Sequence, residues 1–164
     1  MSLVFRALLV FLIFGAAAEA AEKTDPLPRF ASLRADTVNL RTGPGSRYPI
    51  EWVYRKKGYP VEIIAERDQW RQVRDWQGTE GWVQQRMVTG IRNVVINKGA
   101  QRTMRADAAA NASPIAKLDP GVIAKLVECR DTFCRIQIQN GKDEIKGWLA
   151  RGDLWGVYPN EVIH

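Results

Sequence analysis

Hydrophobic and polar residues alternate along most of this chain, and a period of two predicts β-strands. In residues 70–75 tryptophan, glutamine and arginine alternate with arginine, valine and aspartate. A polar turn containing Gly78 follows, and Trp82 and Val83 resume the alternation, so we expect a β-hairpin here. Gly81 should let the backbone pass close to a neighbouring strand, because glycine has no side chain.

The same pattern occurs twice. The signature Gly-Trp-aliphatic at residues 81–83 returns at residues 147–149, again after an alternating strand and a polar turn. Five short strands per unit, bounded by glycine and proline, imply a small closed or half-open β-barrel. Apart from one helical turn expected over residues 84–87, we find no helical period beyond the N-terminus. The predicted fold class is therefore all-β, with two tandem small barrels.

The N-terminus has the layout of a secretory signal peptide. Arg6 precedes the apolar run 7–14, and Ala18-Glu19-Ala20 offers a cleavage site after Ala20. As a helix, residues 7–18 would rise only about 18 Å against a hydrocarbon core of roughly 30 Å, so a permanent membrane anchor is the weaker alternative. The sequence thus predicts an exported, periplasmic protein.

These patterns divide the chain into five segments. The expected segments are a signal peptide (1–20), a flexible leader (21–34), a first barrel (35–90), a second barrel (91–158) and a C-terminal tail (159–164).

The chain is basic, with a formal net charge of +6 and a pI of about 9.6. Because an exported protein has no routine access to nucleic acid, we expect anionic envelope polymers or acidic proteins as electrostatic partners. The alternative is that the positive charge serves solubility alone.

Only two cysteines are present, Cys129 and Cys134. They end one predicted strand and begin the next, and facing strand positions lie within disulfide range. In an oxidising compartment the pair should form a disulfide. The alternative is a catalytic redox pair, although that chemistry favours two residues between the cysteines at a helix start.

Three stretches carry a resemblance to a known family. Residues 39–45 (N-L-R-T-G-P-G), 70–73 (W-R-Q-V) and 78–83 (G-T-E-G-W-V) resemble the bacterial SH3 (SH3b) domain family. The second unit keeps Met104-Arg105 and the 147–149 signature but lacks the Gly-Pro-Gly loop. The resemblance covers about residues 31 to 158. It implies two SH3-like barrels that bind a ligand, often cell-wall peptidoglycan or its peptides, in a targeting or scaffolding role.

Residues suited to enzyme chemistry are scarce. The sole histidine, His164, is the last residue, which disfavours histidine-based triads and histidine-rich metal sites. We therefore expect no catalytic residue, metal or cofactor. A carboxylate pair at one barrel end is the alternative, drawn from Glu66, Asp68, Asp75 and Glu80.

Residues suited to binding are better represented. We expect a ligand site in the first unit that combines aromatic stacking area with arginines able to pair with carboxylates. Arg41 has an alternative role in bracing the loop that follows it. The predicted ligand-binding residues are Arg41, Arg47, Tyr48, Trp52 and Trp76.

The remaining aromatic residues have structural roles in this scheme. Trp82 and Trp148 should be central to the two cores, and Trp70 and Phe133 should join them. Trp155 and Tyr158 should cover the seam between the units.

The function predicted from sequence is non-enzymatic recognition of peptidoglycan or wall peptides by the first unit. The alternative is a periplasmic scaffold that pairs an exposed strand edge with an extended peptide or a partner protein, without glycan affinity. Both ligand identity and oligomeric state stay open at this point.

Overall fold

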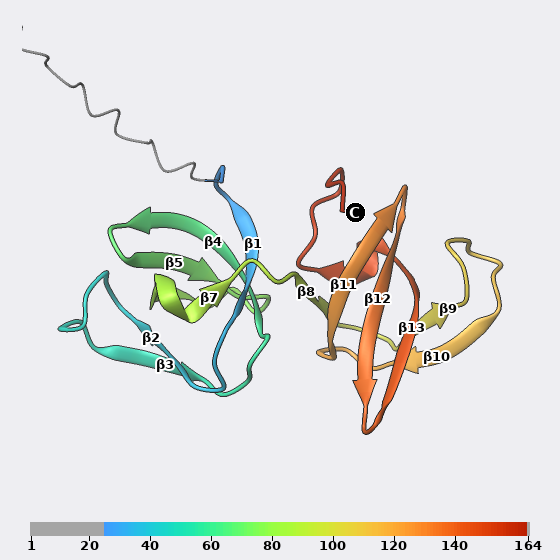
Figure 1. Ribbon diagram of the computed structural model, residues 1–164, viewed down its shortest axis with the longest axis horizontal. Coiled ribbons are helices and arrows are strands. Elements are labelled where there is room, and N and C mark those ends of the chain that lie inside the picture. The colour runs from blue at the N-terminus through green and yellow to red at the C-terminus, as the bar shows by residue number, and fades with distance from the viewer. Residues whose placement is uncertain (1–24, 164) are drawn as a thin grey trace, which may run out of the picture.

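The computed structural model describes residues 25–163, so the signal peptide expected over residues 1–20, and His164, lie outside the described residues. The described chain forms two β-units side by side (Figure 1), and its only helical elements are two 3-10 turns. The predicted all-β class is confirmed. Within residues 25–163 no helix is long and apolar enough to cross a bilayer.

The first unit is a seven-stranded antiparallel sheet with strand order β3-β2-β6-β5-β4-β1-β7. The helical turn predicted over residues 84–87 is present as η1 (Gln85–Met87). The strands are β1 (Arg29–Leu33), β2 (Val38–Arg41), β3 (Ile50–Tyr54), β4 (Pro60–Arg67), β5 (Trp70–Arg74), β6 (Glu80–Gln84) and β7 (Val88–Thr89).

The second unit repeats this arrangement with strand order β10-β9-β13-β12-β11-β8-β14. Its 3-10 turn, η2 (Arg151–Asp153), occupies the place of η1. The strands are β8 (Asn93–Ile96), β9 (Arg102–Arg105), β10 (Pro114–Leu118), β11 (Ile123–Arg130), β12 (Phe133–Asn140), β13 (Asp143–Ala150) and β14 (Leu154–Trp155).

The sheets differ from the sequence expectation in two ways. Each has seven strands rather than five, and neither closes into a barrel, so β3 and β7 remain free edges of the first sheet. The flexible leader expected over residues 21–34 is also too long, because β1 pairs with β4 and β7 and its Leu33 is fully buried. The apolar residues of β1 complete the core of the first unit.

Alternation along each strand sends one face inward. Val73 and Val83 are fully buried in the first core, and Ile136 and Leu149 take the matching places in the second. The prediction that Trp82 is central to the core is wrong. Successive residues of a strand point to opposite faces, so the burial of Val83 turns Trp82, which is half-buried, outward.

The other three predicted core aromatic residues differ from one another. Trp148 is buried as predicted, at 5% exposed, although it is not part of the cluster that contains its neighbour Leu149. Trp70 and Phe133 are half-buried strand starts and belong to neither core cluster. The positions of large aromatic residues were therefore not sufficient to predict which face of each strand is buried.

Gly81 and Gly147 each sit where the sheet leaves no room for a side chain. A Cβ at Gly81 would lie 2.6 Å from Cγ of Leu40, and one at Gly147 would lie 2.7 Å from Cγ of Met104. The predicted close approach at Gly81 is confirmed and occurs twice.

The predicted disulfide is also present. Cys129 and Cys134 are bonded and lie opposite each other in the β11–β12 register.

Aromatic side chains fill the seam between the two units. Phe30 of the first unit packs against Trp155 and Tyr158, at centroid distances of 5.0 and 4.6 Å. The hydroxyl of Tyr158 donates a hydrogen bond of 2.8 Å to Glu62 in β4. The predicted seam role of Trp155 and Tyr158 is confirmed.

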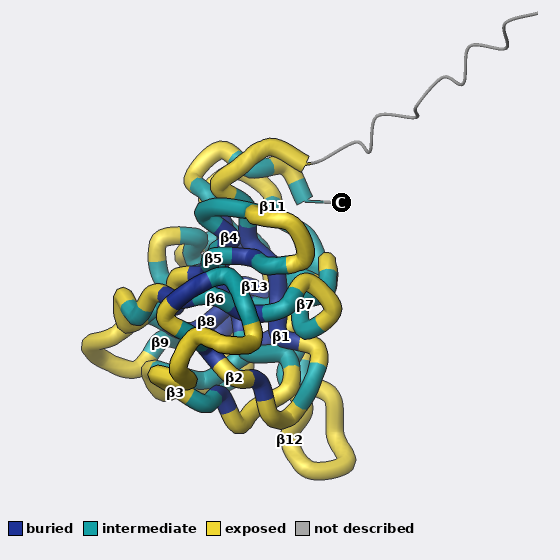
Figure 2. The backbone as a smooth tube through the Cα atoms, turned by 90° about the vertical axis from the view of Figure 1, so that its left-hand side faces the viewer, coloured by how far each residue is buried: buried dark blue, intermediate teal, exposed yellow. Residues whose placement is uncertain are grey.

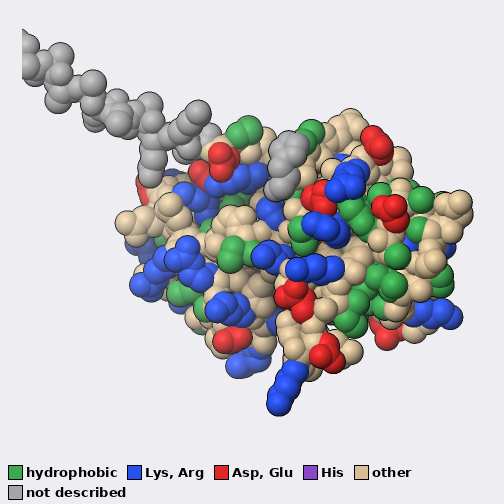
Figure 3. Space-filling view, turned by 45° about the vertical axis from the view of Figure 1, so that its right-hand side comes forward, with side chains coloured by type: hydrophobic (Ala, Val, Ile, Leu, Met, Phe, Trp, Pro, Cys, Tyr) green, Lys and Arg blue, Asp and Glu red, His purple; other side chains and the backbone are tan. Residues whose placement is uncertain are grey.

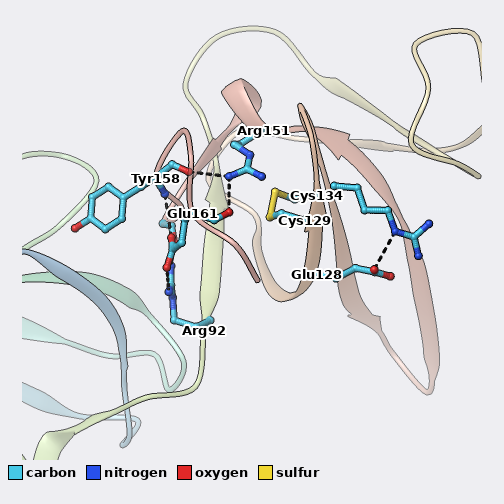
Figure 4. The surroundings of a disulfide bond; sticks show 9 residues. Arg92, Glu128, Cys129, Cys134, Arg151, Tyr158 and Glu161 are labelled. Atoms are coloured by element: carbon cyan, nitrogen blue, oxygen red, sulfur yellow. Dashed lines mark hydrogen bonds and ion pairs between the residues drawn. A yellow bond between two sulfur atoms is a disulfide. The ribbon is translucent and has the colours of Figure 1, made fainter. Parts of the chain in front are cut away.

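The chain end is fastened by four residues, Arg92, Arg151, Tyr158 and Glu161, which we name the C-terminal clasp (Figure 4). Arg92 forms an ion pair with Glu161, and the Tyr158 N–H donates to the same carboxylate at 3.1 Å. Arg151 donates to the carbonyl oxygens of Tyr158 and Glu161 at 2.9 and 2.8 Å. Burial alone would raise the pKa of Glu161, but the hydrogen bonds and the charges of Arg92 and Arg151 outweigh it and lower that pKa.

Candidate binding face

Exposed apolar side chains gather at the free edge formed by β3. Tyr48, Ile50 and Trp52 are 40%, 48% and 55% exposed, and they occupy alternate positions over five residues. We name these three residues the β3 face. Figure 2 shows the exposed chain around β3 at the edge of the first unit. The register shifts within this segment, with Ile50 opposite Arg41 and Trp52 opposite Leu40, so the three residues share an exposed segment and not a regular strand face. Large apolar side chains exposed close together in the sequence are typical of a binding surface.

The loop before β3 is built to hold Tyr48. Its ring lies so close to Gly43 that a Cβ there would overlap it, and a Cβ at Gly45 would lie 3.2 Å away. The guanidinium group of Arg41 donates to the carbonyl oxygen of Tyr48 at 2.7 Å. Arg41 therefore braces the loop, the alternative role expected from the sequence.

Beside the β3 face, three side chains line up across the sheet. Arg41 of β2 is paired with Trp82 of β6, and Trp82 is paired with Gln72 of β5. Directly paired residues share one face of a sheet, and all three are half-buried. The row joins a cation, an indole ring and an amide, which together can stack on an apolar group and hydrogen-bond a polar one.

The second unit lacks this surface. Arg135 replaces Gln72 as the strand partner of the tryptophan, and the guanidinium carbons of Arg130 and Arg135 lie 4.9 and 5.9 Å from the Trp148 ring. Such cation–π contacts cover the aromatic ring. Its edge strand β10 carries Pro114 and Lys117, residue types that discourage further strand pairing.

The fold places the remaining two predicted site residues, Arg47 and Trp76, in different regions. Arg47 is exposed in the loop beside Tyr48. Trp76 is half-buried at the seam, where its ring lies 5.4 Å from Nζ of Lys98 and its indole N–H donates to Tyr59 at 2.8 Å. The structure thus joins Arg41 to Tyr48 by a hydrogen bond, places exposed Arg47 and Trp52 within the same short segment, and directs Trp76 toward the second unit.

Three of the four carboxylates considered for catalysis have structural partners, and the fourth, Asp68, lies in the turn between β4 and β5 at a φ of 50°. Glu66 forms ion pairs with Arg29 and Arg71, and Glu80 forms one with Arg74. Buried Asp75 accepts hydrogen bonds from the N–H groups of Gln77 and Thr79, both at 2.9 Å, and so shapes the hairpin turn.

The hydroxyl of Tyr54 also bonds Asp75, at 3.2 Å. Burial, strengthened by the charge of Asp75, raises the pKa of Tyr54. Among residues 25–163 no group of three histidine, cysteine, aspartate or glutamate side chains could hold a metal ion.

Comparison with known families agrees with this duplicated architecture. The model of the bacterial SH3 domain family matches residues 34–90 and again residues 98–156, which is more than half of the chain. The chain belongs to the bacterial SH3 domain family. Its two sheets are two tandem SH3-like units, and members of this family bind cell-wall components or proteins.

Several solved structures resemble this SH3 domain chain distantly. NlpC1 and NlpC2 from Trichomonas vaginalis share 12% and 13% identity with it, both at a TM-score of 0.36. The matches cover 82% and 80% of this chain but only 48% and 49% of theirs. An NlpC/P60 family protein from Bacillus cereus shares 14% identity at a TM-score of 0.34, covering 77% of this chain and 55% of its own.

The chain therefore spans about half the length of these proteins. Similarity at such low TM-scores indicates nothing about what the chain does. A search of curated protein sequences found no match.

Sequence reasoning missed three residues of this SH3 domain surface. Ile50 lies between Tyr48 and Trp52 at the end of the glycine-rich loop, and this local position could have placed it on the β3 face. Trp82 could have been found by the period of two, because Val83 already supplied the core contact. Gln72 gave no local signal, since only the strand register places it beside Trp82.

Proposed function

We propose that this protein is a non-enzymatic, exported binding module that recognises peptidoglycan or wall peptides in the periplasm. The ligand would lie on the β3 face, with the row of Arg41, Trp82 and Gln72 beside it. The supporting observation is that Tyr48, Ile50 and Trp52 are exposed together on a free strand edge. Such a combination of aromatic area and polar groups suits a sugar ring or a short peptide.

Arginine contributes charge selectivity in this proposal. Arg47 is exposed and can form a two-pronged contact with a carboxylate of a wall peptide. Arg41 uses one nitrogen to hold Tyr48, so it positions the aromatic ring and offers its remaining donors to the ligand. The second unit, with its tryptophan covered by arginine, serves as a structural support.

The test is retention on purified sacculi. We expect the wild type to be retained and the double variant Tyr48→Ala with Trp52→Ala to lose retention. Ile115→Ala is the matched control, since Ile115 is the exposed isoleucine of β10 in the second unit. Absence of wild-type retention, or an equal loss in the control, would contradict the proposal.

The open edge of β3 supports a second candidate, a periplasmic scaffold that pairs with an extended peptide. β3 contains neither proline nor lysine, and its only strand partner is β2, so its outer backbone groups can add a strand. Binding of peptides without retention on sacculi would favour this function. Peptide binding should then be lost in Ile50→Pro, because proline cannot donate to the added ladder.

A further inference from the structure

The opposite edge of the first sheet borders a cleft of about 1220 Å³. It lies between β1, η1 and β7 on one side and the C-terminal clasp on the other. β3 and β7 are the two ends of the same strand order, so this cleft is separate from the β3 face. Its floor includes the apolar side chains of Phe30, Ala31 and Ile63.

The walls of the cleft are strongly cationic. Two acidic side chains, Asp25 and Glu161, line it. Glu66 neutralises Arg29 and Arg71, and Glu161 neutralises Arg92. The arginines that line the cleft are Arg29, Arg34, Arg71, Arg86 and Arg92.

Two of these arginines, Arg34 and Arg86, have no carboxylate within salt-bridge distance among residues 25–163. A backbone hydrogen bond of 2.8 Å from Arg34 to Met87 holds their two segments side by side. Figure 3 shows that Lys and Arg side chains also predominate over the visible face of the first unit. Nε of Arg86 donates to the side-chain oxygen of Gln84 at 2.6 Å, and its other donors have no carboxylate partner. Two guanidinium groups without carboxylate partners, lining one cleft from adjacent segments, favour a ligand with more than one negative charge.

The backbone at this edge favours a peptide. Among residues 25–163 the one strand partner of β7 is β1, so the outer edge of β7 can hydrogen-bond an extended chain. Gln69 and Gln85 also line the cleft, and their amides can both donate to and accept from peptide groups. The cleft exceeds the roughly 300–1,000 Å³ typical of small-molecule sites, which leaves room for several extended residues.

We propose that this cleft is a second binding site, which takes an extended acidic peptide whose carboxylates pair with Arg34 and Arg86. The inference goes beyond the proposed function, because it concerns a different ligand at a different edge. A protein with both sites could hold an acidic partner segment and a wall ligand at the same time.

The test is fluorescence anisotropy with a labelled peptide of alternating glutamate and threonine, which places its carboxylates on one side when extended. A glutamine–threonine peptide of equal length is the neutral probe. We expect Arg34→Gln with Arg86→Gln to weaken binding of the acidic peptide by about tenfold or more. The matched control is Arg55→Gln with Lys57→Gln, which removes the same charge at exposed residues outside the cleft and should change affinity by no more than about twofold.

Three outcomes would overturn the proposal. They are an equal loss in the control pair, equal binding of the neutral peptide, and displacement of the peptide by tripolyphosphate at the same charge concentration. Tyr48→Ala with Trp52→Ala should leave peptide affinity unchanged, so failure here is distinguishable from failure on sacculi. Thermal unfolding of each variant should verify that it is folded.

Discussion

At the residue scale, the two units carry a glycine at matching positions, and both glycines meet the same packing requirement. Gly81 lets β6 pass close to β2, and Gly147 lets β13 pass close to β9. A Cβ at either position would also lie 3.0 or 2.8 Å from the backbone oxygen of Arg41 or Arg105. A backbone oxygen has little freedom to retreat. The absence of a side chain is therefore required for packing at both sites.

Gly81→Ala should lower the free energy of unfolding by about 1–3 kcal/mol, the usual cost of an overpacked core. Gly90→Ala is the control, since no atom lies within 4 Å of a Cβ at that position. Urea denaturation of the two variants checks this. Equal stability of both variants would contradict the close approach.

Trp82 and Trp148, the tryptophans of the two Gly-Trp signatures, have different environments because the residues around them differ. Trp82 pairs with Gln72, whereas Trp148 pairs with Arg135, whose guanidinium group lies over the ring. Arg130 and Arg135 thus both cover the Trp148 ring, whereas within residues 25–163 no cation–π contact is found at Trp82.

Gln72→Arg should place a guanidinium group over the ring of Trp82, as Arg135 does over the ring of Trp148. We expect retention on sacculi to fall about two- to fivefold, the size of an exposed cation–π contact. The reciprocal change Arg135→Gln should leave retention as in the wild type. If Gln72→Arg is retained as fully as the wild type, Trp82 does not contribute to the β3 site.

At the scale of elements, the hairpin of β11 and β12 is fastened at its tip. The disulfide joins directly opposed positions, so the ring that it closes is short. In the chain-entropy model a short ring removes little freedom from the unfolded chain. The backbone of this hairpin also meets the chain end, because the N–H of Cys129 donates to the carbonyl oxygen of Ile163 at 3.2 Å.

Reduction of this disulfide should lower the free energy of unfolding by about 2 kcal/mol. Denaturation with and without reductant measures the change directly, since the chain contains two cysteines only. Cys129→Ser with Cys134→Ser should be insensitive to reductant. A much larger loss would mean that the bond also holds the C-terminal residues in place.

At the scale of the whole molecule, contacts between distant segments join the units. Asn93, which follows the linker, donates to the carbonyl oxygen of Gly58 at 2.7 Å, and Tyr158 reaches Glu62. Burial and the hydrogen bond to Glu62 raise the pKa of Tyr158, so its hydroxyl stays protonated and remains a donor at neutral pH.

Tyr158→Phe should keep the ring against Phe30 and lose only this hydrogen bond. We expect a loss of about 1–2 kcal/mol, in the range for a hydrogen bond to a charged group. Tyr48→Phe is the matched control, because Tyr48 is exposed on the β3 face. A double-mutant cycle with Glu62→Gln tests the pairing, and additivity of the two changes would contradict it.

The C-terminal clasp should make stability depend on acid. The pKa of Glu161 is lowered from its ordinary value of 4.5, so its stabilising contribution is present above that pH and is lost as pH falls through the lower folded value. The stability difference between the wild type and Glu161→Gln should therefore shrink as pH decreases below about 4.5. A difference that is constant from about pH 7 to pH 3 would contradict the role of this carboxylate in the clasp.

Local patterns were sufficient to predict much of the fold. The period of two placed most strands, the repeated glycine signature revealed the duplication, and the spacing of Cys129 and Cys134 predicted the disulfide. The leader was misjudged because β1 is short and carries no neighbouring turn signal of its own. Its strand character comes from pairing with β4, more than twenty-five residues away.

The candidate site was predictable only in part, for the same reason. Tyr48 and Trp52 lie next to a Gly-Pro-Gly loop, a local feature that placed them at the surface. Trp76 had no visible partner in its own hairpin, yet Tyr59 and Lys98 cover it. No pattern near residue 76 reports on these contacts.

The sequence by itself determined that this protein is an all-β duplication, with its turns, its disulfide and an aromatic loop, because periodicity, glycine and cysteine act over a few neighbouring residues. Only the tertiary structure decided which face of each strand is buried, that the sheets stay open, and that arginines gather in a cleft beside β7. These features depend on contacts between segments that are far apart in the sequence, and no local pattern reports on such contacts.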